Sequence, residues 1–245
     1  MGLGRWIGGL LGWVSFGPIG ALIGYILGAV LEGDDSPRPS QRRASGSYSA
    51  TEQRNSFLVS LLVLSSAVIK ADGRILQSEL DHVRSFIRAN FGEGAVPEAM
   101  RILQELNGKN IDINEVGGQI GRYMNYSQRL QLFHYLAQLA MADGEFSKSE
   151  KQMLERIAAV IGLSAADANS VIAMFYKDTD AAYAVLEIEK TATDDEVRRA
   201  YRRMAMKYHP DKVASLGADV QKSAGEKFRQ VKDAYEAIKA ERGMS

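Results

Sequence analysis

The chain has 245 residues, 46% of them hydrophobic, which is enough for one or two globular domains with their own cores. The 30 basic and 30 acidic side chains give a formal net charge of zero, which argues against a general nucleic-acid-binding protein. The sequence has no cysteine, which excludes disulfides, thiol catalysis and cysteine zinc sites, and His82, His134 and His209 lack the spacing of metal ligands.

The first predicted element is a glycine-rich apolar segment. No charged residue occurs in the 26 positions from Trp6 to Leu31. As a helix this run would be about 39 Å long, enough to cross a hydrocarbon core of about 30 Å with some tilt. Residues 1–32 are therefore predicted to form a transmembrane anchor. The steps of four between Gly20, Gly24 and Gly28 would let two such helices approach closely, so we expect a homodimer.

Three other interpretations of the apolar run stay open. A secretory signal peptide would need a basic start and a small-residue cleavage site, and the run is long for one. A break at Gly17-Pro18 would give a re-entrant hairpin whose arms are too short to span a bilayer. The glycine content disfavours a buried helix of a soluble core.

Arginines after the run indicate its orientation. Arg38, Arg42 and Arg43 follow it and only Arg5 precedes it, which favours a cytoplasmic C-terminal side without settling the orientation. Residues 33–52 are mostly Asp, Ser, Pro, Arg, Gly and Gln, with little to bury. This composition is typical of a flexible linker.

Residues 53–176 are predicted to be nearly all helical and to contain an internal repeat. Ala71-Asp72-Gly73, followed by Ser78-Glu79, recurs 71 positions later as Ala142-Asp143-Gly144, followed by Ser149-Glu150. Apolar positions of the flanking helices repeat in the same way. Each copy is therefore predicted to be a helix, a turn containing glycine, and a second helix.

Further helix signals lie between and after the two copies. Pro97 precedes a helix predicted over residues 98–106, and another is predicted over 114–124. Ser147 with Glu150, and Ser164 with Asp167, form capping boxes. The last of these helices is expected to reach about Tyr176.

The doubled turn resembles the TerB-like tellurite-resistance domain, an all-helical fold with pseudo-twofold repeats. The resemblance implies that four acids are candidate ligands of a divalent metal: Asp72, Glu79, Asp143 and Glu150. We favour a structural role, in which each Asp closes a turn and each Glu caps a helix. Neither copy has the oxygen-ligand density of a calcium loop. We therefore predict neither metal nor cofactor.

A second helical unit is predicted from about residue 180 onward. Thr193 and Glu196 form a capping box at the start of a helix. One face of that helix is apolar: Val197, Tyr201, Met204, Ala205 and Tyr208. The opposite face carries the basic strip: Arg198, Arg199, Arg202, Arg203 and Lys207. Like charges at these spacings cost a few tenths of a kcal/mol per pair. The strip is therefore predicted to meet an acidic partner rather than only solvent.

The tripeptide His209-Pro210-Asp211 follows the basic helix. Pro210 ends that helix, because proline biases the residue before it away from helical angles. After a connection containing Gly217, Phe228, Val231, Tyr235 and Ile238 mark the apolar face of a second helix. The pattern predicts a helical hairpin with the tripeptide exposed at its tip.

These residues resemble the J-domain of DnaJ-type co-chaperones. The run from Glu196 to Lys212 matches that family's second helix and loop, Tyr183 its first helix, and the run from Phe228 to Ile238 its third. The J-domain is predicted over residues 180–245. The connection from Val213 to about Lys222 is several residues longer than the commonest form in the family.

The resemblance implies an all-α, non-enzymatic co-chaperone that stimulates the ATPase of a DnaK-type chaperone. The partner-binding residues would be the basic strip, Tyr201, His209, Pro210 and Asp211. With its glycine-rich anchor and TerB-like domain (residues 53–176), the whole chain resembles membrane-anchored, DjlA-like co-chaperones. That implies a single-pass protein of a bacterial inner membrane, with most of its chain in the cytoplasm. Because only residues 177–180 separate the two helical units, we expect a restricted relative orientation.

Two other functions are compatible with the sequence. One is a membrane-associated stress or metal-responsive scaffold that acts through the TerB-like domain. The other is RNA or DNA binding through the basic helix, which the absence of stacking aromatic residues disfavours.

Overall fold

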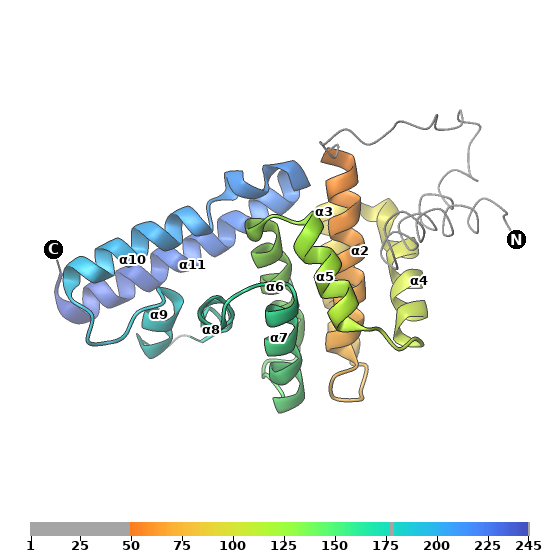
Figure 1. The fold of residues 1–245 in the computed structure, drawn as a ribbon, viewed down its shortest axis with the longest axis horizontal. Coiled ribbons are helices and arrows are strands. Elements are labelled where there is room, and N and C mark those ends of the chain that lie inside the picture. Colours follow the sequence, from red (N-terminus) through yellow and green to blue (C-terminus); the bar gives the residue numbers. More distant parts are fainter. Residues whose placement is uncertain (1–49, 177–178, 245) are drawn as a thin grey trace, which may run out of the picture. The chain divides into compact units, whose positions relative to one another are not determined.

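A computed structural model describes residues 50–176 and 179–244. Within these ranges the chain forms ten α-helices and two 3-10 helices and contains no strand (Figure 1). The all-helical prediction is confirmed for this part of the chain. The predicted anchor, with Gly20, Gly24 and Gly28, and nearly all of the predicted linker lie outside the described residues.

Seven α-helices precede the interruption at residues 177–178. They are α2 (Ala50–Ile69), α3 (Gln77–Phe91), α4 (Val96–Asn107), α5 (Ile113–Tyr123), α6 (Tyr126–Ala140), α7 (Lys148–Val160) and α8 (Ala165–Ala173), with the 3-10 helix η1 (Glu93–Ala95) before α4. Residues 61–245 form one compact unit, and α2 crosses its boundary. We call residues 61–173 the bundle. Among the described helices, none is both long and apolar enough to span a bilayer.

The helix boundaries reproduce the internal repeat. The helix α2 ends at Ile69 and α3 begins at Gln77, and α6 and α7 end and begin 71 positions later, at Ala140 and Lys148. The last helix of the bundle ends at Ala173, three residues before the predicted end. The predicted two copies of helix, turn and helix are therefore present.

Glycine and aspartate form both turns in the same way. Gly73 and Gly144 have φ angles of 79° and 103°, which a residue without Cβ adopts at little cost. The carboxylate of Asp72 accepts a hydrogen bond from the amide of Arg74 (2.9 Å). The equivalent Asp143 accepts one from the amide two residues later (3.3 Å). The aspartates close the turns, as the sequence predicted.

Apolar side chains from most of the helices fill the core of the bundle. Tyr135 of α6 is fully buried; its ring lies 4.2 Å from that of Phe86, and its hydroxyl accepts a hydrogen bond from Ser65 (3.3 Å). Other fully buried side chains of the bundle are Leu61, Leu62, Leu64, Ile69, Ile87, Leu103, Ile120, Leu130, Leu132 and Phe133.

The glycine at position 117 sets the distance between α5 and α7. A Cβ atom on Gly117 would lie 2.5 Å from Cγ2 and 2.8 Å from the carbonyl oxygen of Val160. Because a rotamer change cannot move that carbonyl, Gly117→Ala is expected to lower the free energy of unfolding by about 1–3 kcal/mol. Urea denaturation followed by circular dichroism measures this. The control is Gly118→Ala, whose Cβ would meet open space; equal stability of the two variants would contradict the prediction.

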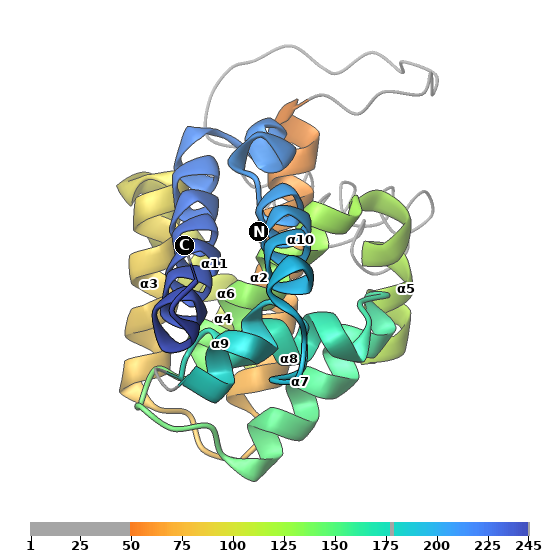
Figure 2. The same ribbon diagram turned by 90° about the vertical axis from the view of Figure 1, so that its left-hand side faces the viewer.

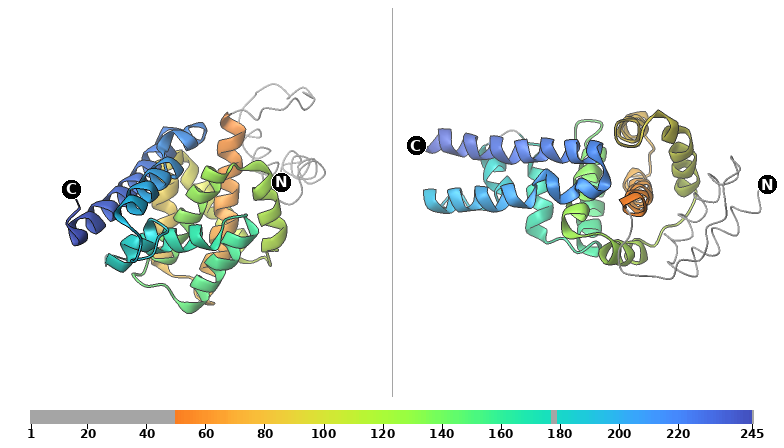
Figure 3. Two further views of the ribbon diagram at one scale, coloured as in Figure 1. Left: turned by 60° about the vertical axis from the view of Figure 1, so that its left-hand side comes forward. Right: turned by 90° about the horizontal axis from the view of Figure 1, so that it is seen from above.

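The helices after the interruption form the predicted hairpin. Its elements are α9 (Thr179–Val185), α10 (Asp194–Lys207), the 3-10 helix η2 (Pro210–Leu216) and α11 (Ala218–Arg242). The long helices α10 and α11 run antiparallel, side by side, with α9 against α11 (Figures 1–3). Val197 and Met204 of α10 and Val231 and Ile238 of α11 are fully buried.

The connection between the two long helices is shorter than the sequence suggested. It was expected to run to about Lys222, but α11 already begins at Ala218. Gly217 ends η2 with a φ of 108°, and Val220, one turn into α11, is fully buried.

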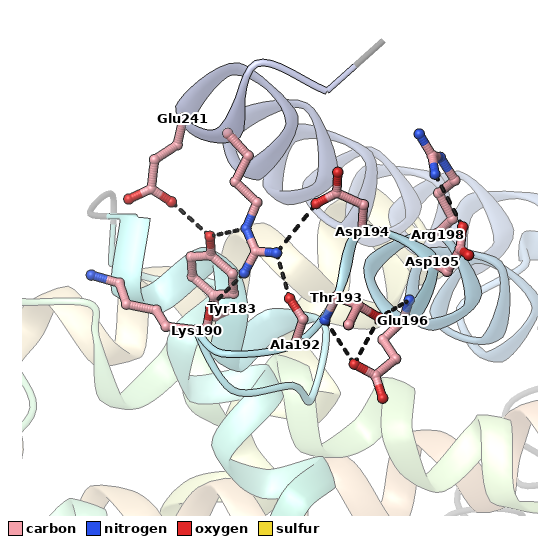
Figure 4. A network of polar contacts seen from close by, with 10 residues as sticks. Tyr183, Lys190, Ala192, Thr193, Asp194, Asp195, Glu196, Arg198 and Glu241 are labelled. Atoms are coloured by element: carbon pink, nitrogen blue, oxygen red, sulfur yellow. Dashed lines mark hydrogen bonds and ion pairs between the residues drawn. The ribbon is translucent and has the colours of Figure 1, made fainter.

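Arg242, near the end of α11, closes the base of the hairpin. Its guanidinium donates hydrogen bonds to the carbonyl oxygens of Lys190 and Ala192, both at 2.5 Å, and to the hydroxyl of Tyr183 at 2.7 Å (Figure 4). The Tyr183 hydroxyl in turn donates to Glu241 (2.8 Å). The end of α11 is thus tied to α9 and to the segment before α10.

Candidate functional site

The basic helix begins with the predicted capping box. The hydroxyl of Thr193 accepts a hydrogen bond from the amide of Glu196 (3.3 Å), and the Glu196 carboxylate accepts one from the amide of Thr193 (2.7 Å). These bonds satisfy two amides that the first turn leaves without helical partners. The cap fixes where α10 starts, and hence which face its basic residues occupy.

The side chains of the basic strip differ in their exposure and in their partners. Arg199 and Arg202 are exposed, and Arg198, with its side chain 37% exposed, pairs with Asp195 at 3.1 Å. Arg203 is more engaged, because its guanidinium donates to the carbonyl oxygen of Leu186 (3.1 Å).

Lys207, the last residue of the strip, is only 15% exposed. Its ammonium forms ion pairs with Asp167 of α8 and with Glu187 after α9. It also lies 6.0 Å from the centre of the Tyr126 ring, at the start of α6. The side chain is therefore turned toward the bundle. Because Asp167 and Tyr126 are distant in sequence, the helical pattern around Lys207 contained no signal for these contacts.

The carboxyl group of Asp167 stays ionised well below neutral pH. Its carboxylate accepts hydrogen bonds from the amide (2.8 Å) and the hydroxyl (2.6 Å) of Ser164, which confirms the predicted capping box. Its side chain is only 3% exposed. Although burial raises the pKa of Asp167, hydrogen bonds from Lys207, Ser164 and Tyr126 outweigh it and lower the pKa to about 2.

The tripeptide lies where α10 ends, with an extended His209 (φ −63°, ψ 130°). The ring nitrogen Nδ1 of His209 accepts a hydrogen bond from the amide of Asp211 (3.3 Å), and Pro210 begins η2. The side chains of His209 and Asp211 are 49% and 77% exposed. A stiffened turn thus presents an imidazole and a carboxylate to solvent.

Residues of α11 contact the side chains of this turn. The His209 ring meets the ring of Phe228 edge-on at 5.9 Å, and the Gln221 amide donates to the Asp211 carboxylate (3.2 Å). Tyr201 of α10 stacks on Tyr235 of α11 with ring centres 4.4 Å apart. Tyr201 is half-buried, so part of its ring belongs to the core of the hairpin.

The segment after the tripeptide lies against α6. Val213 and Leu216 of η2 are buried, and Gln128 of α6 forms a hydrogen bond with Ser215 (3.3 Å). Two more polar pairs follow along α6 and α11: Gln131 with Ser223 (3.4 Å) and His134 with Gln230 (3.2 Å). The partners on α6 are three residues apart and share one face of that helix.

Each of the four acids of the repeat accepts a hydrogen bond from a backbone amide two or three residues away. The carboxylate of Glu79 accepts from the amide of Leu76 (2.7 Å), and that of Glu150 from the amide of Ser147 (2.8 Å). Burial raises the pKa of Glu79 to about 7, and the charges of Glu150, Asp72 and Asp143 add to the effect. Across the described residues, no three histidine or carboxylate side chains are grouped in a way that could hold a metal ion.

Two family models match the chain. The model of tellurite resistance protein TerB matches residues 58–173, and the DnaJ domain model matches residues 181–243. No solved structure matches.

Individual relatives match the chain at two scales. It is 27% identical to co-chaperone protein DjlA of Coxiella burnetii over 266 aligned positions, which cover 99% of this chain and 98% of that protein. It is 25% identical to co-chaperone protein DjlA of Photobacterium profundum, with 98% and 99% covered. Over 56 residues it is 50% identical to chaperone protein DnaJ of Neisseria meningitidis, which covers 23% of this chain and 14% of that protein.

Proposed function

Because the chain is a DjlA-like J-domain protein that carries a TerB domain, we propose that it acts as a co-chaperone and stimulates the ATPase of a DnaK-type chaperone. One observation carries the proposal: the exposed His209 and Asp211 follow directly on a helix whose basic residues Arg199 and Arg202 are also exposed. A single partner surface can meet both features at once.

The two features have different physical roles. Exposed arginines attract an acidic surface and orient it during the encounter, which chiefly raises the association rate. The carboxylate of Asp211 is a single positioned charge that can compete for a basic group of the partner through charge-assisted hydrogen bonds. We assign no catalytic step to this chain; nucleotide hydrolysis belongs to the partner.

The proposal includes a membrane tether. The uncharged run from Trp6 to Leu31 supports a single-pass anchor over residues 1–32. Its glycines at steps of four support self-association through Gly20, Gly24 and Gly28. Such an anchor would hold a co-chaperone at the cytoplasmic face of a bacterial inner membrane, where a cytoplasmic DnaK-type partner can reach it.

A steady-state ATPase assay tests the proposal. Adding the full chain to a DnaK-type chaperone should raise ATP turnover to a plateau. The concentration of the chain at half-plateau should increase with salt, because the Debye length falls from about 10 Å at 0.1 M to about 3 Å at 1 M. A turnover rate that stays at its basal value at every concentration would refute the proposed function.

Charge-neutralising variants locate the salt-sensitive surface. Arg202→Gln should raise the half-plateau concentration and flatten its salt dependence. Arg156→Gln is the matched control, because Arg156 is an exposed arginine of α7. Equal effects of the two substitutions would show that net charge matters and the position of the basic strip does not.

A further inference from the structure

Lys207 differs from the exposed arginines of the basic strip in what it contacts. Its ammonium is held between the carboxylates of Asp167 and Glu187 and is largely shielded from solvent. Arg199 and Arg202, on the same helix, are exposed. An acidic partner would have to break two ion pairs to use Lys207, so this residue is a poor docking contact.

The surroundings of the Asp167 carboxylate favour an ion pair with Lys207. Its carboxylate is almost fully buried and is held by two hydrogen bonds from Ser164. A buried carboxylate without a cationic partner is strongly destabilising, which keeps Lys207 in place. Lys207 is the last residue of α10 and lies two positions before His209.

A second attachment follows the tripeptide. Gln128 of α6 forms a hydrogen bond with Ser215, and Val213 and Leu216 are buried. The tripeptide therefore lies between two points at which the chain is fixed to the bundle: Lys207 before it and residues 213–216 after it. The tripeptide itself is left exposed, so the bundle fixes the loop without covering it.

We propose that Asp167 and Lys207 are positioning residues of the His209-Pro210-Asp211 loop: the TerB-like bundle holds Lys207, and thereby sets the orientation in which the loop meets the DnaK-type partner. This inference rests on the proposed function and deepens it. On this proposal the TerB-like bundle contributes to the function of the J-domain site, and Lys207 contacts the bundle instead of the partner.

A double-mutant cycle in the full chain tests the pair. Asp167→Asn and Lys207→Gln should each lower the plateau of ATPase stimulation about fivefold, with the half-plateau concentration nearly unchanged. Both substitutions break the ion pair between Asp167 and Lys207, and Lys207→Gln also breaks the pair with Glu187. The double variant should therefore lose about as much as Lys207→Gln alone, rather than the roughly 25-fold of two independent effects. Glu155→Gln, at an exposed acid of α7, is the control and should behave as wild type.

A docking role for Lys207 predicts a different result. Lys207→Gln would then raise the half-plateau concentration, and would do so in the Asp167→Asn background as well. Additive effects, or an unchanged plateau in Asp167→Asn, would overturn the proposal. Asp167 also caps α8, so Asp167→Asn weakens that cap as well as the ion pair. Lys207→Gln leaves the cap intact and therefore tests the attachment of Lys207 without that effect.

Amide hydrogen exchange separates this inference from the proposed function. In both single variants the amides of residues 208–217 should exchange several-fold faster, while those around Tyr135 in the core keep their protection. If the wild-type chain failed to stimulate any DnaK-type ATPase, the proposed function would fall, and exchange would still report on the attachment. Unchanged exchange over residues 208–217 would overturn the positioning role.

Discussion

Asp211→Asn is expected to reduce ATPase stimulation by about thirtyfold or more while leaving the helical content unchanged. Truncating or neutralising one partner of an interfacial charge pair typically costs about 2–5 kcal/mol, and 1.4 kcal/mol is a factor of about ten. The side chain of Asp211 is 77% exposed, so its charge contributes little to folding. Asparagine keeps the shape of the side chain and an oxygen that can accept the hydrogen bond from Gln221.

His209→Gln should produce a similar loss for a different reason. The Nδ1 atom of His209 accepts the amide hydrogen bond of Asp211, and its ring packs edge-on against Phe228. Glutamine is longer and flexible, so the turn would lose its fixed geometry even where the hydrogen bond forms. Circular dichroism should show both variants as helical as the wild type.

The matched control for Asp211→Asn is Asp233→Asn, because Asp233 is an exposed acid of α11 in the same J-domain. The control should stimulate as well as the wild type. If Asp211→Asn retained full stimulation, the carboxylate at the tip of the hairpin would have no part in the mechanism. If both variants lost activity alike, the loss would reflect net charge.

The features predicted correctly from sequence are local ones. Capping boxes such as Thr193 with Glu196 join residues three positions apart, so their geometry follows from one helical turn. The internal repeat was visible because each turn needs the same Asp-Gly pair, at Asp72-Gly73 and again 71 positions later. Pro210 ends α10 because its ring disfavours helical backbone angles in the residue before it.

The features that the sequence did not reveal join distant segments. Lys207 falls in step with the arginines of the strip, and spacing along one helix cannot show that Asp167 lies opposite Lys207. The extent of α11 was underestimated for a related reason. Val220 is buried by tertiary contacts, and these extend the helix over residues expected to connect it.

Lys227 of α11 is a further example, because its spacing from Val231 and Ile238 puts it on the buried face of the helix, where a charged side chain is not expected. Its side chain is 2% exposed, and its ammonium donates to the carbonyl oxygen (3.1 Å) and hydroxyl (3.2 Å) of Ser223 in its own helix. Lys207, His209 and Gln131 of α6 line the same small cavity. Burial lowers the pKa of Lys227 to about 7, opposed by the nearby charge of Glu226.

The shifted pKa makes stability depend on pH in a defined window. Between pH 7 and about 10.5 the unfolded chain keeps a proton on Lys227 that the folded chain has lost, so the free energy of unfolding should rise with pH by up to about 1.4 kcal/mol per unit. Below pH 7 both states are protonated and this slope vanishes. Burial, with the charge of Lys227, also lowers the pKa of His134, which removes stability as pH drops below 6.5, whereas the raised pKa of Glu79 adds stability as pH drops from about 7 to 4.5.

Lys227→Met is therefore expected to raise the free energy of unfolding at pH 7 by about 1–4 kcal/mol, since it replaces a buried charge with an apolar side chain of similar length. Urea denaturation at pH 7 and pH 9 measures this. The gain should be smaller at pH 9, because the wild-type lysine is by then mostly neutral. Lys232→Met, at an exposed lysine of the same helix, is the control and should change neither value. A variant less stable than the wild type at pH 7 would show that the hydrogen bonds to Ser223 outweigh the burial of the charge.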